Sequence, residues 1–148
     1  NTVREYDIAR ARRLVTLKLV GYTETVHALL DRLPASRETG IVLFGGRAKD
    51  APYPGSTTVA TINGGVEGLT HSMALELAPM RVNGLHPGII GDSPFWAATL
   101  AAVEAYESRT PGGALATMAD IVGATMFLLD NQGVSGTSLY VDRGWRLT

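Results

Sequence analysis

Two long stretches of helical periodicity enclose a short apolar run in the first half of this chain. Large apolar residues recur every three or four positions over residues 6–33 and again over residues 56–78, which predicts two amphipathic helices. Residues 41–44 are all apolar, include β-branched side chains and stop at Gly45-Gly46, as expected for a buried strand. This alternation favours a parallel sheet whose strands are joined by right-handed helical crossovers.

The second half of the chain continues the same alternation. Residues 81–86 and 138–141 predict two further strands, and helices are predicted over residues 94–109 and over a stretch that ends at Leu129. Thr117 and Asp120 precede this last helix with the spacing of a capping box. We therefore expect one α/β domain over residues 1–148, with helices on both faces of a parallel sheet of about three strands.

A pair of glycines interrupts the predicted helix over residues 56–78. Gly64 and Gly65 cost roughly 2 kcal/mol relative to alanine at helical positions. We expect this cost to be offset by the close approach of another backbone or helix.

Composition and charge exclude several classes of function. The 148 residues include 13 basic and 14 acidic side chains, for a net charge of −1, so neither nucleic acid nor an anionic membrane is an expected partner. No apolar run approaches the roughly 20 residues of a membrane span. The chain has no cysteine and no His, Asp or Glu grouping with metal-ligand spacing, so we expect no metal and a cytoplasmic location.

Several segments together resemble the short-chain dehydrogenase/reductase family. The run NGGVEGLTHSMALEL from Asn63, followed by RVN and HPG, is similar to the central helix and next strand of that family. The ending VSGTSLYVDRGW from Val134 resembles the family's last strand and terminal turn, with Arg143 where a glycine is usual. The resemblance covers the C-terminal half of the family's fold.

This resemblance implies a Rossmann-like parallel sheet, NAD or NADP as cofactor, and hydride transfer between the nicotinamide and the carbonyl or alcohol group of a small-molecule substrate. The family's glycine-rich phosphate loop lies on its first strand and helix, and this sequence contains no counterpart of it. We therefore expect the chain to be the later part of a longer protein, to bind a dinucleotide poorly alone, and to leave the outer edge of residues 41–44 unpaired.

The family's usual catalytic residues are replaced in this sequence. Members have a serine after the strand, a tyrosine thirteen residues further and a lysine four residues beyond the tyrosine, and these positions hold Gly46, Val59 and Asn63. Glycine and valine have no proton to give, so the usual acid/base mechanism cannot run through them. The pattern resembles that of a divergent bacterial subgroup of the family.

A lysine stands where the family has an asparagine on the preceding helix. Lys18 occupies that position while Asn63 occupies the usual lysine position, as if the two had exchanged places. One hypothesis makes both residues catalytic, with Lys18 supplying the cationic donor and Asn63 also facing the cofactor ribose. The alternative is that Lys18 merely borders the apolar stripe and extends to solvent.

The turn after the second predicted strand is the other candidate for cofactor binding. Pro87, Gly88 and Ile90 match the family's turn, whose backbone meets the nicotinamide amide, while Asp92 replaces the usual threonine and Ser93 could supply a hydroxyl. The alternative is a plain turn that ends a strand.

Further polar and aromatic residues are weaker candidates. His86 lies near the expected cleft and is more readily explained as a structural residue. Tyr22, one helical turn after Lys18, is either a displaced phenolic acid or part of the core. The aromatic residues after the Pro-Gly turn could line an apolar pocket or pack the helix onto the sheet. The other weak candidates for a functional site are His27, His71, Tyr53, Phe95, Trp96 and Tyr106.

Three functional hypotheses remain open from the sequence. The first is an oxidoreductase of the short-chain type with an atypical active site. The second is a non-catalytic scaffold or ligand-binding protein on the same fold. The third is a structural half that pairs with a copy of itself or with another half, and the resemblance implies a homo-oligomer through the helices over residues 6–33 and 56–78.

Overall fold

The computed structural model describes residues 2–96 and 99–148. A nearly continuous helical segment opens the chain, followed by three strands, three further α-helices and two short 3-10 turns. In chain order the elements are α1 Ile8–Val15, a π-helical segment Thr16–Val20, α2 Gly21–Leu29, a 3-10 turn Leu30–Arg32, β1 Gly40–Phe44, a 3-10 turn Arg47–Lys49, α3 Thr57–Glu76, β2 Arg81–Pro87, α4 Leu100–Glu107, α5 Met118–Asp130, β3 Ser138–Val141 and a 3-10 turn Trp145–Leu147.

The three strands form one parallel sheet in the order β1-β2-β3. Gly40 of β1 is in register with Arg81 of β2, and Gly84 of β2 with Ser138 of β3. The predicted parallel sheet of about three strands is therefore confirmed. Within the described residues β1 pairs only with β2, so its outer edge has no neighbouring strand, as the sequence predicts.

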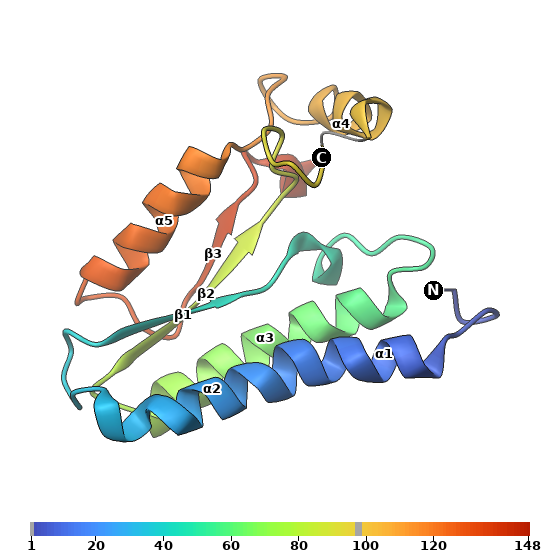
Figure 1. Cartoon of the computed structure of the whole chain (residues 1–148). Coiled ribbons are helices and arrows are strands. Elements are labelled where there is room, and N and C mark those ends of the chain that lie inside the picture. The colour runs from blue at the N-terminus through green and yellow to red at the C-terminus, as the bar shows by residue number, and fades with distance from the viewer. Residues whose placement is uncertain (1, 97–98) are drawn as a thin grey trace.

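Helices cover both faces of this sheet (Figure 1). α5 lies on one face, and α1, α2 and α3 lie together on the other. One group of buried residues joins the sheet to the α2 and α3 side, and a second joins it to α5. The predicted α/β architecture with helices on both faces is confirmed. The first group is Val26, Leu43, Val66, Met73 and Val82, and the second is Leu85, Ile121 and Leu128.

The first long helix differs from the uniform helix predicted over residues 6–33. It begins at Ile8, where the Asp7 side chain accepts a hydrogen bond from the Arg10 backbone N–H, and it widens into a π-helical segment over Thr16–Val20. π-Helical segments within α-helices are rare and frequently mark functional sites. Here the segment contains Lys18.

The two glycines in α3 differ in what surrounds them. A Cβ at Gly65 would lie 2.8 Å from Leu19 Cδ1, so this glycine permits the close approach of the first helix, as predicted. A Cβ at Gly64 would meet nothing within 4 Å among the described residues. The predicted close approach therefore explains Gly65 but not Gly64 within one chain.

The segment between β2 and α5 is less helical than the prediction over residues 94–109. α4 spans only Leu100–Glu107, and residues 97–98 of the predicted helix lie outside the described residues. Successive turns, with Ser93 N donating to Ile90 O and Trp96 N to Ser93 O, replace the predicted first helical turn. The predicted capping box of α5 is confirmed, because Thr117 and Asp120 exchange hydrogen bonds between side chain and backbone.

Arg81 closes the amino end of the sheet. Its side chain is 2% exposed and donates to four backbone carbonyls: Arg37 O at 2.6 Å, Leu128 O at 2.7 Å, Asn131 O at 2.9 Å and Leu129 O. Three of these acceptors belong to the C-terminal end of α5, where the helix dipole favours a positive charge. Arg81 therefore joins β2 to the end of α5 and the loop before β1.

Candidate functional site

The carboxyl end of β1 lies against His86, which is fully buried in β2. A side chain at Gly45 would overlap the His86 ring, and Gly46 N donates to His86 Nδ1 at 3.2 Å. The other side of the ring stacks on Tyr140, with the ring centroids 5.4 Å apart. Burial, together with the nearby charge of Lys49, lowers the pKa of His86. A neutral His86 that accepts from Gly46 has the geometry of a structural residue that fixes this turn.

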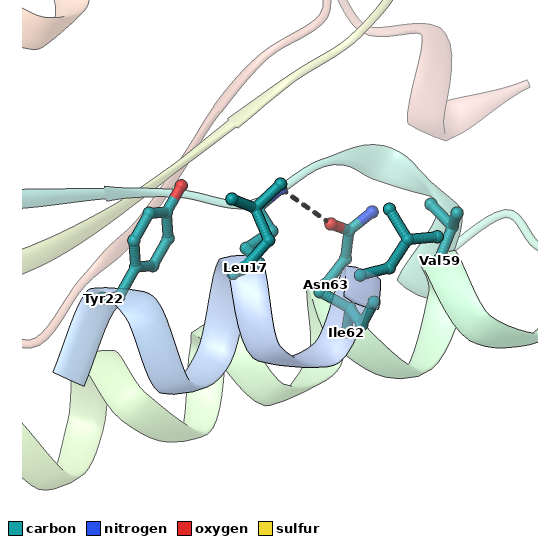
Figure 2. A pocket seen from close by; sticks show the side chains of 7 residues that line it. Leu17, Tyr22, Val59, Ile62 and Asn63 are labelled. Carbon is teal, nitrogen blue, oxygen red and sulfur yellow. Dashed lines mark hydrogen bonds between the residues drawn. The ribbon is translucent and has the colours of Figure 1, made fainter. Parts of the chain in front are cut away.

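Lys18 and Asn63 are in contact at the same end of the sheet. Lys18 Nζ donates to Asn63 Oδ1 at 3.3 Å and to Gly45 O at 3.0 Å. The dashed line that ends at the Asn63 oxygen in Figure 2 is the first of these bonds. Burial lowers the pKa of Lys18. A lysine ammonium has three N–H donors, so two are used here and one remains for a ligand or water. The structure thus brings together the two residues whose family positions are exchanged.

The contact with Lys18 determines how the Asn63 amide is oriented. An ammonium group can only donate, so the amide oxygen must face Lys18 and the amide nitrogen must point away. Figure 2 shows the Asn63 nitrogen directed away from this bond. Asn63 is 4% exposed, and among the described residues no acceptor lies within hydrogen-bonding reach of its Nδ2. Asn63 Nδ2 is not among the fully buried polar atoms without a partner, so this nitrogen is open to the cavities that Asn63 lines and can donate to a ligand or water there.

The Asn63 amide also explains the glycine at the usual serine position. Gly46 has an extended backbone, with φ 168°, which any residue can adopt. A Cβ there would lie only 2.8 Å from Asn63 Nδ2, so space and not backbone geometry selects glycine. The Asn63 amide nitrogen therefore lies beside the place where a serine side chain would begin.

Two cavities meet at α3. The first, of about 400 Å³, lies between the first long helix and α3, and the second, of about 180 Å³, lies at the carboxyl ends of β1 and β2. Both are lined by Val59 and Asn63, so the free Asn63 amide stands at their common wall. The first is lined by Leu14, Leu17, Lys18, Tyr22, Val59, Ile62 and Asn63, and the second by Arg47, Ala48, Ala51, Tyr53, Val59, Asn63, Pro87, Gly88, Ile89, Trp96, Tyr106 and Trp145.

The sequence leaves two roles open for Tyr22, as a residue of the core or as a phenolic acid at the site, and its position is compatible with either. Its ring packs against the core between the helices and the sheet, while its side chain also lines the first cavity. The hydroxyl donates to Phe44 O at 3.0 Å. Burial raises the pKa of Tyr22, although the bond to Phe44 partly opposes this. The phenol is therefore protonated at neutral pH.

The turn after β2 is only partly at the site. Pro87 and Gly88 line the second cavity, whereas Ile90 and Ser93 are not among its lining residues. Ile90 instead forms a bridge with Ala116. The carboxylate of Asp92, at the usual threonine position, accepts from Met118 N at 2.7 Å and so caps the start of α5.

A charged network beside the site was missed from the sequence. Arg47 pairs with Asp142 at 2.9 Å and with Asp50 at 2.8 Å, and Lys49 pairs with Glu67 at 3.1 Å and donates to the Tyr140 hydroxyl. Burial alone would lower the pKa of Lys49, but its bonds to Tyr140, Asp50 and Glu67 raise it. The available signal was the cluster of charges directly after a predicted strand.

The remaining candidates divide between the site and the surface. Tyr53, Trp96 and Tyr106 line the second cavity, whereas Phe95 is 79% exposed. His27 and His71 are exposed on helices. Over residues 2–96 and 99–148 no cluster of His, Asp or Glu could hold a metal ion, and none of the helices there is both long and apolar enough to cross a membrane.

The site residues fit only one end of a dinucleotide. The free N–H of Lys18 and the Asn63 amide are suitable donors for hydroxyl and carbonyl oxygens, as a nicotinamide ribose and a substrate would present. The sequence has no glycine-rich loop between a strand and a helix that could hold a pyrophosphate. Among the described residues, the polar groups at this site therefore suit the nicotinamide end of such a cofactor.

Relatives in sequence and structure share this arrangement of elements. The short-chain dehydrogenase/reductase malC of Malbranchea aurantiaca is 27% identical over 149 residues, covering 95% of this chain and 54% of malC. An uncharacterised oxidoreductase of Schizosaccharomyces pombe is 31% identical over 138 residues, covering 88% of this chain and 53% of that protein. The chain thus spans about half the length of these relatives.

Solved structures agree closely with the fold. The MalC reductase/Diels-Alderase from Malbranchea aurantiaca superposes with a TM-score of 0.93 at 25% identity, over 100% of this chain and 59% of MalC. A small-chain dehydrogenase in complex with NADPH gives a TM-score of 0.90 at 25% identity, over 100% of this chain and 68% of that structure.

A family model described as enoyl-(acyl carrier protein) reductase matches residues 1–146, nearly the whole chain. Together with the named relatives and the solved structures, this match confirms the resemblance that the sequence motifs suggest. The chain belongs to the short-chain dehydrogenase/reductase family of oxidoreductases.

Proposed function

We propose that this chain forms the substrate side of an NAD- or NADP-dependent oxidoreductase that interconverts a carbonyl and an alcohol on a small molecule. The observation that supports this most is the Asn63 amide, which is held through its oxygen by Lys18, makes no hydrogen bond through its nitrogen among the described residues and belongs to the lining of two cavities. A fixed donor of this kind can polarise a carbonyl oxygen and stabilise the negative charge that develops on it.

Lys18 fixes this donor and supplies a second one. Its bonds to Asn63 Oδ1 and Gly45 O hold the amide in one orientation, and its third N–H can donate to a ribose hydroxyl. The nicotinamide, when bound, supplies or accepts the hydride. Lys18 and Asn63 together would thus replace the family's serine and lysine, while Pro87, Gly88, Ile90 and Ser93 would provide the turn beside the nicotinamide.

Tyr22 is the residue that we assign to proton transfer. Val59, at the usual tyrosine position, has no proton to donate. The Tyr22 phenol lines the first cavity together with Lys18 and Asn63, and it is protonated at neutral pH because burial raises its pKa. To deliver a proton to the oxygen of a reduced carbonyl, its hydroxyl would have to leave the bond to Phe44 O and turn toward Asn63, which lines both cavities.

The proposed enzyme acts in the cytoplasm as a homo-oligomer formed through α1, α2 and α3. Leu17, in the π-helical segment between α1 and α2, and Leu75 in α3 are 74% and 83% exposed, and a Cβ at Gly64 of α3 would meet nothing within 4 Å among the described residues. Apolar side chains on neighbouring helices are typical of an interface. Light scattering should give a mass above that of one chain, and Leu75→Glu should reduce it; an unchanged monomeric mass would contradict this part.

The test of the proposal uses the natural gene product that contains this chain. Titration with NADH and NADPH, monitored by nicotinamide fluorescence, should show saturable binding. The same protein should reduce carbonyl compounds with one of these cofactors. Asn63→Leu should lower kcat by about 10²–10³-fold, as does the loss of one donor to a developing oxyanion. His71→Gln, on the exposed side of the same helix, is the matched control and should leave kcat unchanged. Absence of nicotinamide binding would instead favour the scaffold or ligand-binding alternative.

A further inference from the structure

The second cavity has an unusually aromatic wall. Tyr53, Trp96, Tyr106 and Trp145 line it, and the last three form a chain of edge-to-face contacts. The ring centroids of Trp96 and Tyr106 are 6.4 Å apart, and those of Tyr106 and Trp145 are 5.4 Å apart. Rings held against one another in this way present fixed faces and edges, to which another aromatic ring binds favourably.

The charge of the cavity is already neutralised. Among the described lining residues Arg47 is the one charged side chain, and it pairs with the carboxylates of Asp142 and Asp50 while its guanidinium lies over the Trp145 ring at 5.4 Å. A carboxylate or phosphate on a ligand would compete with these two acidic groups for one guanidinium. The cavity therefore favours a ligand without charge.

The size of the cavity limits what it can take. Its volume is about 180 Å³. A protein cavity of about 150 Å³ is large enough to hold benzene. One aromatic ring with a short substituent therefore fits, so the nicotinamide would lie at the mouth of the cavity, beside Pro87 and Gly88, and not inside it. The amide of Asn63 on the same wall is placed to donate to an oxygen on that substituent.

We propose that the second cavity binds the aromatic ring of a neutral aryl ketone or aldehyde, with the carbonyl oxygen accepting from the Asn63 amide. This inference rests on the proposed oxidoreductase function and names its substrate class. It follows from the wall of aromatic rings, the paired charge of Arg47 and the position of Asn63. The hydroxyl product of the same aryl compound would bind at the same place.

Ligand binding to the full chain, measured without any nucleotide, tests this directly. Acetophenone, cyclohexyl methyl ketone and benzoate serve as probes in ligand-observed NMR titrations, since they differ in aromaticity and charge. Acetophenone should bind about fivefold more tightly than the saturated ketone, because an aromatic pair adds a modest favourable energy beyond its area. Benzoate should show no saturable binding. Equal affinities for the two ketones, or tighter binding of benzoate, would overturn the inference.

Matched variants locate the binding. Tyr106→Leu should weaken acetophenone binding about fivefold and abolish the preference over cyclohexyl methyl ketone. Phe127→Leu, an aromatic substitution on the exposed side of α5 and outside the cavity, should change nothing. If Tyr106→Leu does not fold, as judged by its ¹H–¹⁵N spectrum, Trp96→Leu provides the same test. Unchanged acetophenone affinity in the folded cavity variant would contradict the assignment.

Turnover separates this inference from the proposed function. Binding of acetophenone without any reduction by NADH or NADPH in the natural gene product would refute the oxidoreductase proposal and leave the aromatic cavity intact. Reduction of saturated ketones as readily as aryl ketones would support the oxidoreductase and overturn the aromatic substrate class.

Discussion

The two ends of the sheet use buried polar side chains in opposite ways. At the amino end, Arg81 donates to four backbone carbonyls, so four of the five N–H groups of a buried guanidinium are bonded to the protein. At the carboxyl end, Lys18 has one N–H without a protein partner, and the buried Asn63 amide has no acceptor among the described residues. One end is closed by hydrogen bonds, and the other retains donors beside two cavities.

The amino end of the sheet therefore contributes to the stability of the fold, and the carboxyl end provides donors for a ligand. Buried polar groups are normally paired, since an unpaired one costs about 1–3 kcal/mol. The amino end follows that rule, whereas His86 Nε2 and Trp145 Nε1 beside the carboxyl end are buried without a hydrogen-bond partner among the described residues. In open parallel sheets ligands bind at the carboxyl ends of the strands.

Removing Arg81 should have the largest effect. Arg81→Met leaves four carbonyls without their donor, and the free energy of unfolding should fall by about 3–5 kcal/mol. Urea denaturation monitored by circular dichroism measures this. Arg37→Met is the matched control, because Arg37 contributes only its backbone carbonyl to the cluster. If Arg81→Met lowers the free energy of unfolding no more than Arg37→Met does, the hydrogen bonds of Arg81 do not stabilise the amino end as described.

A serine at the usual family position should destabilise the carboxyl end. Gly46→Ser places a Cβ 2.8 Å from Asn63 Nδ2, and such overpacking costs about 1–3 kcal/mol. Combining it with Asn63→Ala should recover much of that loss, because the two side chains would compete for one space. Additive losses in a double-mutant cycle would show that Asn63 does not fill the place of the serine.

The pH dependence of stability should reveal the cost of burying Lys18. Burial lowers its pKa below 10.5, so between the lowered value and 10.5 the unfolded chain holds a proton that the folded chain has released. Stability therefore rises with pH in that window. The raised pKa of Lys49 acts in the opposite direction as pH increases past 10.5.

Comparison with Lys18→Met isolates this contribution, since both proteins retain Lys49. Urea denaturation measures the free energy of unfolding of both proteins as the pH is raised toward 10.5. Over this range the native protein should become more stable relative to the variant. A difference that does not change with pH would show that Lys18 is not buried as described.

The smallest effect is expected at Arg143, where the family usually has glycine. Arg143 has φ 49°, in the left-handed region. Arg143→Gly should change stability by less than about 1 kcal/mol, because relief of backbone strain and the greater freedom of unfolded glycine oppose each other.

The same substitution should change the titration of Asp120. The Arg143 guanidinium, with help from Thr117, lowers the pKa of Asp120 to about 2. Its removal should raise that pKa toward 3.8, as measured by NMR titration of the carboxylate, while binding at the carboxyl end stays intact. An unchanged pKa would mean that the ion pair does not form in solution.

The fold was largely predictable because it depends on periodicity. The apolar residues of 41–44, 81–86 and 138–141 are enough to predict three buried strands, and the crossover helices follow from their stripes. The π-helical segment at Thr16–Val20 has no such periodic signal. The partners of Arg81 were not predictable either, because they are backbone carbonyls 44 to 50 residues away in sequence.

The candidate site was predictable where its residues could be aligned with a family pattern. That alignment placed Lys18 and Asn63 in exchanged positions, and the structure shows them in contact. The orientation of the Asn63 amide could not be predicted, because it depends on which group faces the oxygen. The network of Arg47 and Lys49 depends on contacts with residues from three separate elements, which no local pattern contains.

The central claim is that the Asn63 amide is the donor that this site offers to a carbonyl. The most direct measurement is the side-chain ¹H–¹⁵N resonance pair of Asn63, assigned by its absence in Asn63→Leu, during titration with acetophenone. This pair of resonances should shift saturably, with the same affinity as that measured from the ligand signals. Saturable binding of acetophenone with the Asn63 amide resonances unmoved would contradict it.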